Sequence, residues 1–264
     1  MQRVAIVTGA SRGIGKQIAI GLGRAGFDVV VAARTVDAHK RLPGTIGATV
    51  AAVEETGARS LAVRTDMTSP ADVTALVART IDEFGRLDVV VNDAADTSGG
   101  SPALVDLAFE EWERQFDTNL HGPLRLMQAA VPHLQAAGRG VIVNMSSSAG
   151  DLVEHDWAER PADPSGLGGE RLAYAASKAA LNRLANAVAP QLAAAGIAVV
   201  NVDPGFTRTE LVDLMSERGL VDPRASVPMD VPTRTVLHIA TSGDAMRWSG
   251  RILRAADFVA EHGL

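Results

Sequence analysis

The spacing of apolar residues along the chain predicts alternating strands and helices. Short, largely apolar runs are typical of strands buried on both faces of a sheet. They occur at residues 4–7, 29–31, 61–63, 87–91, 141–143 and 197–202, with a last short strand at 251–253. Between them, apolar residues recur every three or four positions, as on one face of a helix. The predicted helices cover residues 14–22, 45–56, the segment after Pro70, 110–135, 172–195 and 233–241.

Strands and helices that alternate in this way indicate right-handed crossovers and a parallel sheet. We therefore expect an α/β fold, a single doubly wound domain over residues 1–264 with about seven parallel strands and helices on both faces. Three connections are too long for tight turns, at residues 34–44, 151–169 and 204–232. The last two follow the fifth and sixth strands, at the edge where such sheets bind ligands. We interpret 151–169 as an insert near the active site and 204–232 as a substrate loop.

Charge and composition narrow the classes of partner. The net charge is -6 and the pI is near 5.5. Because nucleic acids and anionic membranes bind basic surfaces, we expect neither as a partner. The chain has no cysteine, which fits a reducing compartment. No secretory leader precedes the first strand and no apolar run approaches the ~18 residues of a membrane span, so we expect a cytoplasmic protein. The six histidines show no ligand spacing, and we expect no metal site.

A glycine-rich turn joins the first strand to the first helix. It reads Thr8-Gly9-Ala10-Ser11-Arg12-Gly13-Ile14-Gly15. Its glycines allow a sharp turn and a close approach to a pyrophosphate, and the following helix offers free N–H groups and a positive dipole end. Glycines can also serve a turn for conformation alone. The position of this turn at a strand-to-helix junction favours dinucleotide binding.

The end of the second strand indicates which nicotinamide cofactor binds. NAD-binding folds usually place an acid there, which binds the adenosine ribose and would repel a 2′-phosphate. This strand ends Ala32-Ala33-Arg34, without an acid. Arg34 and Arg12 are placed to reach a 2′-phosphate, unless they are merely solvated surface arginines. We therefore expect NADP(H) in preference to NAD(H).

A tyrosine and a lysine lie one helical turn apart in the segment Tyr174-Ala175-Ala176-Ser177-Lys178. A nearby ammonium favours the phenolate, and can make a tyrosine a usable general acid or base near neutral pH. In isolation such a pair is common on protein surfaces. Three serines, Ser146 to Ser148, end the fifth strand at the same sheet edge, where a hydroxyl can bind a carbonyl oxygen.

These motifs together resemble the short-chain dehydrogenase/reductase family, and the resemblance covers nearly the whole chain. It implies a Rossmann fold and a homo-oligomer, a tetramer or a dimer. The motifs that carry it are the glycine-rich turn, Asp66, Val91-Asn92-Asp93-Ala94-Ala95, Asn119, the Ser147 region, Tyr174 to Lys178, and Pro204-Gly205-Phe206-Thr207-Arg208-Thr209. Locally, residues 34–47 are also similar to hydroxysteroid-dehydrogenase-like members.

The resemblance implies a role for each matching residue. Tyr174 is the general acid/base, Lys178 lowers its pKa and binds the nicotinamide ribose, and Ser147 polarises the carbonyl, with Ser146 and Ser148 as second choices. Asn119 holds a water in the proton relay, and Asp66 contacts the adenine amine. The implied cofactor-binding set is Gly9, Ser11, Arg12, Gly13, Ile14, Gly15, Arg34, Asp66, Met67, Asn92, Ala94, Tyr174, Lys178, Pro204, Gly205, Thr207 and Thr209.

The sequence departs from the family pattern in three places. The usual Asn-Asn-Ala-Gly is Asn92-Asp93-Ala94-Ala95 here, for which we expect a small adjustment of the cofactor. Pro190 falls within the helix that carries Tyr174, and we expect it to kink or end that helix beyond the active site. Ser147 and Tyr174 are 27 positions apart, about twice the usual separation, because the insert lies between them.

The expected function is hydride transfer between NADP(H) and a ketone or secondary alcohol, a small-molecule substrate. Two alternatives remain open: an isomerase or dehydratase that uses the same site, and a cofactor-binding sensor without turnover. The insert is either a substrate lid with Trp157 as an apolar wall, or a solvated loop or subunit contact. The apolar residues of the 204–232 loop either belong to the core or line a pocket for an apolar carbonyl compound.

Overall fold

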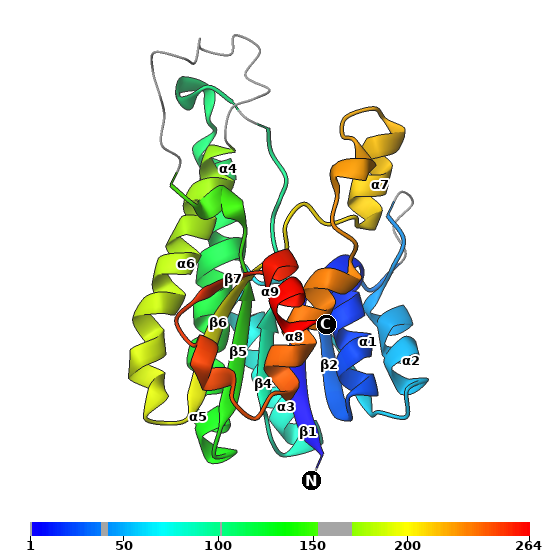
Figure 1. Ribbon diagram of the computed structural model, residues 1–264, viewed down its shortest axis with the longest axis vertical. Coiled ribbons are helices and arrows are strands. Elements are labelled where there is room, and N and C mark those ends of the chain that lie inside the picture. The colour runs from blue at the N-terminus through cyan, green and yellow to red at the C-terminus, as the bar shows by residue number, and fades with distance from the viewer. Residues whose placement is uncertain (1, 38–41, 101, 153–170) are drawn as a thin grey trace.

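The computed structural model describes residues 2–37, 42–100, 102–152 and 171–264. Seven parallel strands form one sheet in the order β3-β2-β1-β4-β5-β6-β7 (Figure 1), which confirms the predicted fold class. The strands are β1 (Arg3–Thr8), β2 (Phe27–Ala33), β3 (Ser60–Arg64), β4 (Val89–Asn92), β5 (Gly140–Met145), β6 (Ile197–Asp203) and β7 (Ile252–Arg254).

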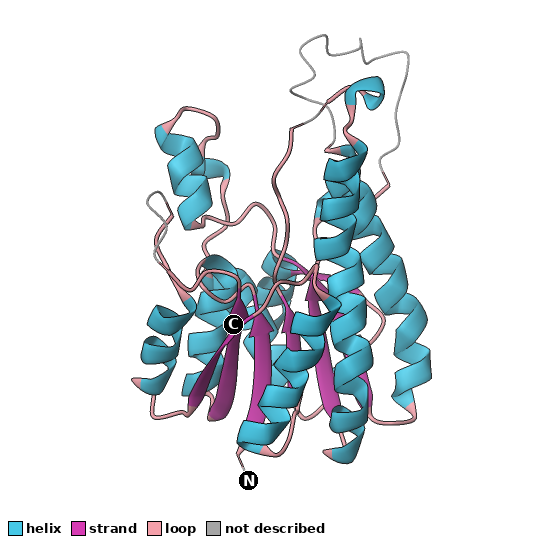
Figure 2. Ribbon diagram, turned by 180° about the vertical axis from the view of Figure 1, so that it is seen from behind, coloured by secondary structure: helices cyan, strands magenta, loops and turns pink. Residues whose placement is uncertain are grey.

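Helices cover both faces of the sheet, and each face has its own apolar core (Figures 1 and 2). The central strands are buried on both sides because they are continuously apolar; every residue of β2 is buried. One face carries α1 (Gly13–Arg24), α2 (Ile46–Glu54), α8 (Asp230–Thr241) and α9 (Ala255–His262). The other carries α3 (Pro70–Phe84), α5 (Gly122–Ala136) and α6 (Leu172–Ala193).

Local sequence signals explain where the helices begin and end. The Thr45 side chain accepts a hydrogen bond from Ala48 N at the start of α2, and Ser69 does the same for Asp72 N at α3. Pro70 occupies the first turn of α3, where its missing N–H costs nothing, and Gly85 ends the helix with φ 71°. By contrast α1 begins after Arg12, which supplies no side-chain cap.

The pairing of β1 with β4 determines where the site lies. β1 pairs with β2 on one side and with β4 on the other, so the strand order reverses between them. The loops that follow β1 and β4 therefore diverge and leave a crevice at the carboxyl edge. This switch point is where open α/β sheets bind their ligands.

The structure refines the predicted helices. The long helix over residues 110–135 is found as α4 (Phe109–Phe116) and α5, joined by a π-helical turn at Asp117–His121. The substrate loop contains a helix, α7 (Glu210–Glu217), and α9 follows β7; neither was predicted. Pro190 was expected to kink or end its helix; it does not end it, because α6 continues through Pro190 to Ala193, and the kink stays a prediction.

Within the described residues, no helix is both long and apolar enough to cross a membrane. Most of the insert, including Trp157, lies outside the described residues, so its interpretation as a lid stays a prediction.

Candidate functional site

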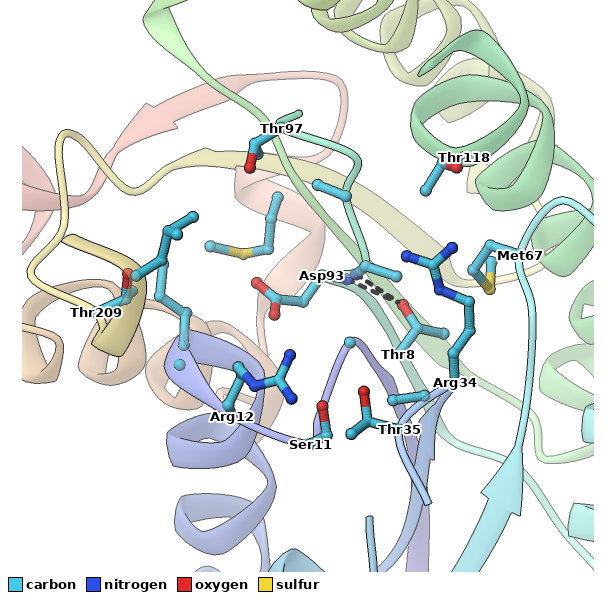
Figure 3. A pocket seen from close by; sticks show the side chains of 18 of the residues that line it. Thr8, Ser11, Arg12, Arg34, Thr35, Met67, Asp93, Thr97, Thr118 and Thr209 are labelled. Carbon is cyan, nitrogen blue, oxygen red and sulfur yellow. Dashed lines mark hydrogen bonds between the residues drawn. The ribbon is translucent and has the colours of Figure 1, made fainter. Parts of the chain in front are cut away.

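A cavity of about 390 Å³ opens at the carboxyl ends of the central strands, beside the switch point (Figure 3). It brings together motifs that are far apart in the sequence. The predicted site residues that line it are Gly9, Ser11, Arg12, Gly13, Ile14, Arg34, Asp66, Met67, Ala94, Tyr174, Lys178, Pro204 and Thr209. Six predicted residues are not among the lining residues: Gly15, Asn92, Asn119, Ser147, Gly205 and Thr207.

The glycine-rich turn forms the base of the cavity. Gly9 has φ +69°, and a Cβ built there would lie 2.8 Å from the backbone of Ala94, so only glycine allows this contact. Thr8 Oγ1 accepts hydrogen bonds from the N–H groups of Asp93 and Ala94, both at 3.1 Å, which bind the end of β4 to this turn (Figure 3). The backbone therefore approaches the cavity closely just where α1 begins.

The side chains of Arg12 and Arg34 differ in their surroundings. Arg12 Nε donates to Pro43 O at 3.1 Å and Nη2 donates to Gly44 O at 3.3 Å, so its guanidinium is held by the loop after β2. Arg34 is exposed and lines the cavity on the other side of Ser11 (Figure 3). Asp66 Oδ1 accepts hydrogen bonds from the backbone and hydroxyl of Thr68. A glycine cradle, a helix N-terminus and these cations fit a nicotinamide dinucleotide.

Tyr174 and Lys178 lie on one face of α6 and close the inner end of the cavity. Lys178 is 3% exposed, and its Nζ donates to Met145 O at 2.7 Å. The same Nζ lies 5.7 Å from the centroid of the Tyr174 ring. The guanidinium carbon of Arg171 lies 4.3 Å from that centroid. Two cations therefore lie near the tyrosine ring.

The pKa of Tyr174 departs from the prediction. Burial raises this pKa above its usual value, which outweighs the lowering effects of a hydrogen bond with Ser147 and of the Arg171 charge. The prediction considered the neighbouring cations and left out desolvation. A further positive charge near the ring would lower the pKa of Tyr174.

The three serines are distinguished by their surroundings. Ser147 is hydrogen-bonded to the Tyr174 side chain, and its Oγ accepts from Ala149 N at 3.2 Å. Ser146 is buried and donates to Asn182 Oδ1, whereas Ser148 is exposed. The short turn at Ser148–Gly150 packs tightly on α6, since a Cβ on Gly150 would lie 2.6 Å from Ala179 N.

Asn119 links the loop after β4 to the helix that carries Tyr174. It lies in the π-helical turn, a feature common at functional sites, and is fully buried. Its Nδ2 donates to Asp96 O and to Ser177 Oγ, both at 3.1 Å, and its Oδ1 accepts from Asp96 N at 2.8 Å. Both N–H groups of the amide are therefore bound to protein atoms.

Buried amides form a ladder across the carboxyl ends of three adjacent strands. Asn92 Nδ2 donates to Asn144 Oδ1 at 2.8 Å, and Asn144 Nδ2 donates to Asn201 Oδ1 at 3.0 Å. The ladder reaches α6 where Asn201 Nδ2 donates to Asn182 Oδ1 at 2.9 Å, the atom that also accepts from Ser146. Asn92 thus uses its side chain to join strands.

The remaining predicted residues shape the loop after β6. Gly205 has φ +69°, and its N–H donates to Asp203 Oδ1 at 3.0 Å. Thr207 Oγ1 donates to Pro204 O at 2.9 Å. These contacts bring Pro204 and Thr209 to the cavity. Gly15 lies behind the lining, where a Cβ would be 2.5 Å from Asp93 Oδ2.

Asp93 is a lining residue that sequence reasoning passed over. Burial raises its pKa to about 7, although the charge of Lys178 and a hydrogen bond from the Gly15 backbone act to lower it. Burial lowers the pKa of Lys178 to about 8, and the charge of Asp93 acts against this shift. The departure from Asn-Asn-Ala-Gly was visible in the sequence, but was read for its alanine and not for its acid.

Replacement of Asp93 by asparagine should change how stability depends on pH. The unfolded chain releases this proton near pH 4 and the folded protein near pH 7, so the wild type loses stability as pH rises through this window. Asp93→Asn has no such proton to lose. The free energy of unfolding of this variant, relative to the wild type, should therefore increase from pH 4 to 7, by at most about 4 kcal/mol. Denaturant unfolding at several pH values measures it. The exposed Asp82→Asn is the control, and parallel curves for wild type and Asp93→Asn would contradict the assignment.

In the part of the chain that the structure describes, no group of three or more histidine or acidic side chains is placed to hold a metal ion. The cavity is lined by the glycine turn, by hydroxyl and apolar side chains, by cations, and by the acids Asp66, Asp93 and Glu210.

Comparison with known proteins gives the same picture. The family model for short chain dehydrogenase matches residues 3–162 and 165–218. The chain is 32% identical over 220 residues to the 3-oxoacyl-(acyl-carrier-protein) reductase FabG of Staphylococcus aureus, covering 82% of this chain and 79% of that one. It is 38% identical over 218 residues to an uncharacterized NAD-dependent oxidoreductase of Mycobacterium tuberculosis, covering 80% and 74%.

A crystal structure of a short-chain type dehydrogenase/reductase from Mycobacterium marinum superposes with a TM-score of 0.80 at 29% identity, over 96% of this chain and 93% of that one. The fold, the order of the motifs along the chain and these matches agree. The chain belongs to the short-chain dehydrogenase/reductase family of oxidoreductases.

Proposed function

We propose that the protein transfers a hydride between NADP(H) and a ketone or secondary alcohol, with Tyr174 as the general acid/base. The observation that supports this most directly is that Tyr174 and Lys178 line the same cavity as the glycine turn, with the Ser147 hydroxyl hydrogen-bonded to Tyr174. When bound, the cofactor supplies or accepts the hydride.

Each side chain has a task that its contacts allow. Tyr174 gives a proton to the developing alkoxide, or takes it back in oxidation. Ser147, hydrogen-bonded to Tyr174, holds the same oxygen and stabilises its growing charge. Lys178 keeps a positive charge beneath the ring and favours the phenolate form. Asn119 fixes Ser177 next to Lys178. Since both N–H groups of its amide donate to protein atoms, a water bound by Asn119 would bind to its Oδ1.

The preference for NADP(H) rests on Arg34 and leads to a direct test. Arg34→Ala should weaken NADPH binding roughly 10- to 100-fold, because a charge-assisted hydrogen bond contributes about 1.5–3 kcal/mol. NADH binding should change less than about twofold. Calorimetric titration of both cofactors measures this difference. Arg24→Ala, at the far end of α1, is the matched control, and equal losses for both cofactors would overturn the preference.

The reaction class is tested by following NADPH and NADH absorbance with a panel of carbonyl compounds. The panel includes 3-oxoacyl thioesters, steroids, quinones, and small aliphatic and aromatic ketones. Net consumption of NADPH with one group identifies a reductase and its substrate class. Conversion of a substrate without net consumption would instead indicate an isomerase or dehydratase. Tight binding with no conversion would favour the sensor alternative.

A further inference from the structure

An acidic side chain from a distant part of the sequence binds the first N–H group of α1. Gly13 N donates to Glu210 Oε2 at 3.0 Å, across 197 positions of the sequence. Gly13 is the first residue of the helix, and it lines the cavity together with Glu210. The carboxylate therefore lies at the helix N-terminus that would receive the cofactor diphosphate.

The local sequence of α1 leaves this position to Glu210. The first turn of the helix contains no acidic residue, and Arg12 provides no side-chain cap. The neighbouring acid, Asp93, is directed at Gly15 and not at Gly13. Glu210 thus gives α1 a negative partner that its own sequence lacks, through a bond to the positive end of the helix dipole.

The helix that carries Glu210 is attached mainly at its base. Residues on either side of α7 are joined where Arg208 N donates to Val227 O at 2.8 Å and Val227 N donates to Phe206 O at 2.7 Å. Above this base, α7 stands apart from the layers around the sheet (Figures 1 and 2). The bond from Gly13 to Glu210 fastens the start of α7 to α1, so the position of this helix depends on what occupies the N-terminus of α1.

We propose that Glu210 competes with the cofactor diphosphate for the N–H of Gly13, and so sets cofactor affinity and links it to the position of α7. A carboxylate and a diphosphate cannot both occupy this donor, and two anions at this distance repel each other. Binding of the cofactor therefore releases Glu210 and the first turn of α7 with it. This inference rests on the proposed function, because it requires a dinucleotide at the glycine turn.

The test compares Glu210→Gln with Glu217→Gln, which removes the same charge from the exposed far end of the same helix. Calorimetric titration should show NADPH binding tightened roughly five- to tenfold in Glu210→Gln and changed less than about twofold in Glu217→Gln. Amides of α7 should also exchange hydrogen faster in Glu210→Gln, since the contact with α1 is weakened. Unchanged or weaker NADPH binding in Glu210→Gln overturns the proposal, because Glu210 would then be only a cap or a cofactor ligand.

A second probe separates this proposal from the proposed function. Inorganic pyrophosphate should raise the melting temperature of Glu210→Gln more than that of the wild type, because the anion no longer competes with a carboxylate. If the wild type binds neither NADPH nor NADH, the proposed function fails. The pyrophosphate comparison then still decides whether Glu210 competes with an anion at the N-terminus of α1. Equal pyrophosphate effects in the two proteins reject the competition.

Discussion

Tyr174→Phe should lower kcat/KM by about 10²- to 10⁴-fold and leave cofactor affinity within about twofold of the wild type. The change removes one oxygen and keeps the ring, so the contacts with Arg171 and Lys178 are retained. What is lost is the proton donor and the hydrogen bond with Ser147. Steady-state rates and calorimetric titration measure the two effects separately. If the variant keeps a tenth or more of the wild-type rate, Tyr174 is not the general acid/base.

The same residue allows a direct spectroscopic check. Tyr174 is the only tyrosine of the chain, so phenolate absorbance reports on it alone, with Tyr174→Phe as the blank. In the protein without cofactor, the pKa should lie above the usual value of about 10, because burial is the largest influence. Ser147→Ala should raise it further, since the hydrogen bond that lowers it is removed. A shift in the opposite direction would show that Ser147 is not its partner.

Lys178→Met should cost about 10²-fold or more in kcat/KM and also weaken cofactor binding several-fold. The lysine is nearly fully buried, and its ammonium is the cation beneath the Tyr174 ring. A methionine of similar length keeps the packing and removes the charge, so the phenolate loses its neighbouring cation. Arg183→Met, on the exposed side of the same helix, is the control and should retain full activity.

Lys178 should also set the alkaline limit of activity. Burial lowers its pKa to about 8, so its proton is lost as the pH rises through that value. The positive charge disappears with the proton, and kcat/KM of the wild type should therefore fall above pH 8. In Asp93→Asn this limit should move to lower pH, because the Asp93 charge raises the pKa of Lys178. A rate that stays constant well above pH 8 would exclude Lys178 as the group that titrates.

The sequence was sufficient for the sheet and much of the site because both depend on local pattern. Continuous apolar runs identified the strands, and a tyrosine and lysine four positions apart had to share a helix face. The glycine turn and Tyr174 each follow the carboxyl end of a strand in a parallel sheet, which places them at the same edge. Such inferences need only periodicity and the rules of chain connection.

Other features depend on contacts between distant segments and could not be read in this way. The carboxylate at the start of α1 comes from Glu210, which is 197 positions away. Asp93 is unusual because of what surrounds it, since burial and Lys178 determine its pKa. The pKa of Tyr174 was predicted in the wrong direction for the same reason: burial is a property of the folded chain. α7 was missed because its apolar positions were read as pocket lining.

The amide ladder has a consequence for how such proteins diversify. It braces the ends of β4, β5 and β6 at right angles to the strands and fastens them to α6 through Asn182. The ladder joins these strand ends through its own side chains, so the floor of the proposed active site does not depend on the loops above it. Those loops are then free to lengthen, as the segment between Ser147 and Tyr174 has done here. A change in these loops would alter the surface above the ladder and leave the hydrogen-bonded strand ends in place.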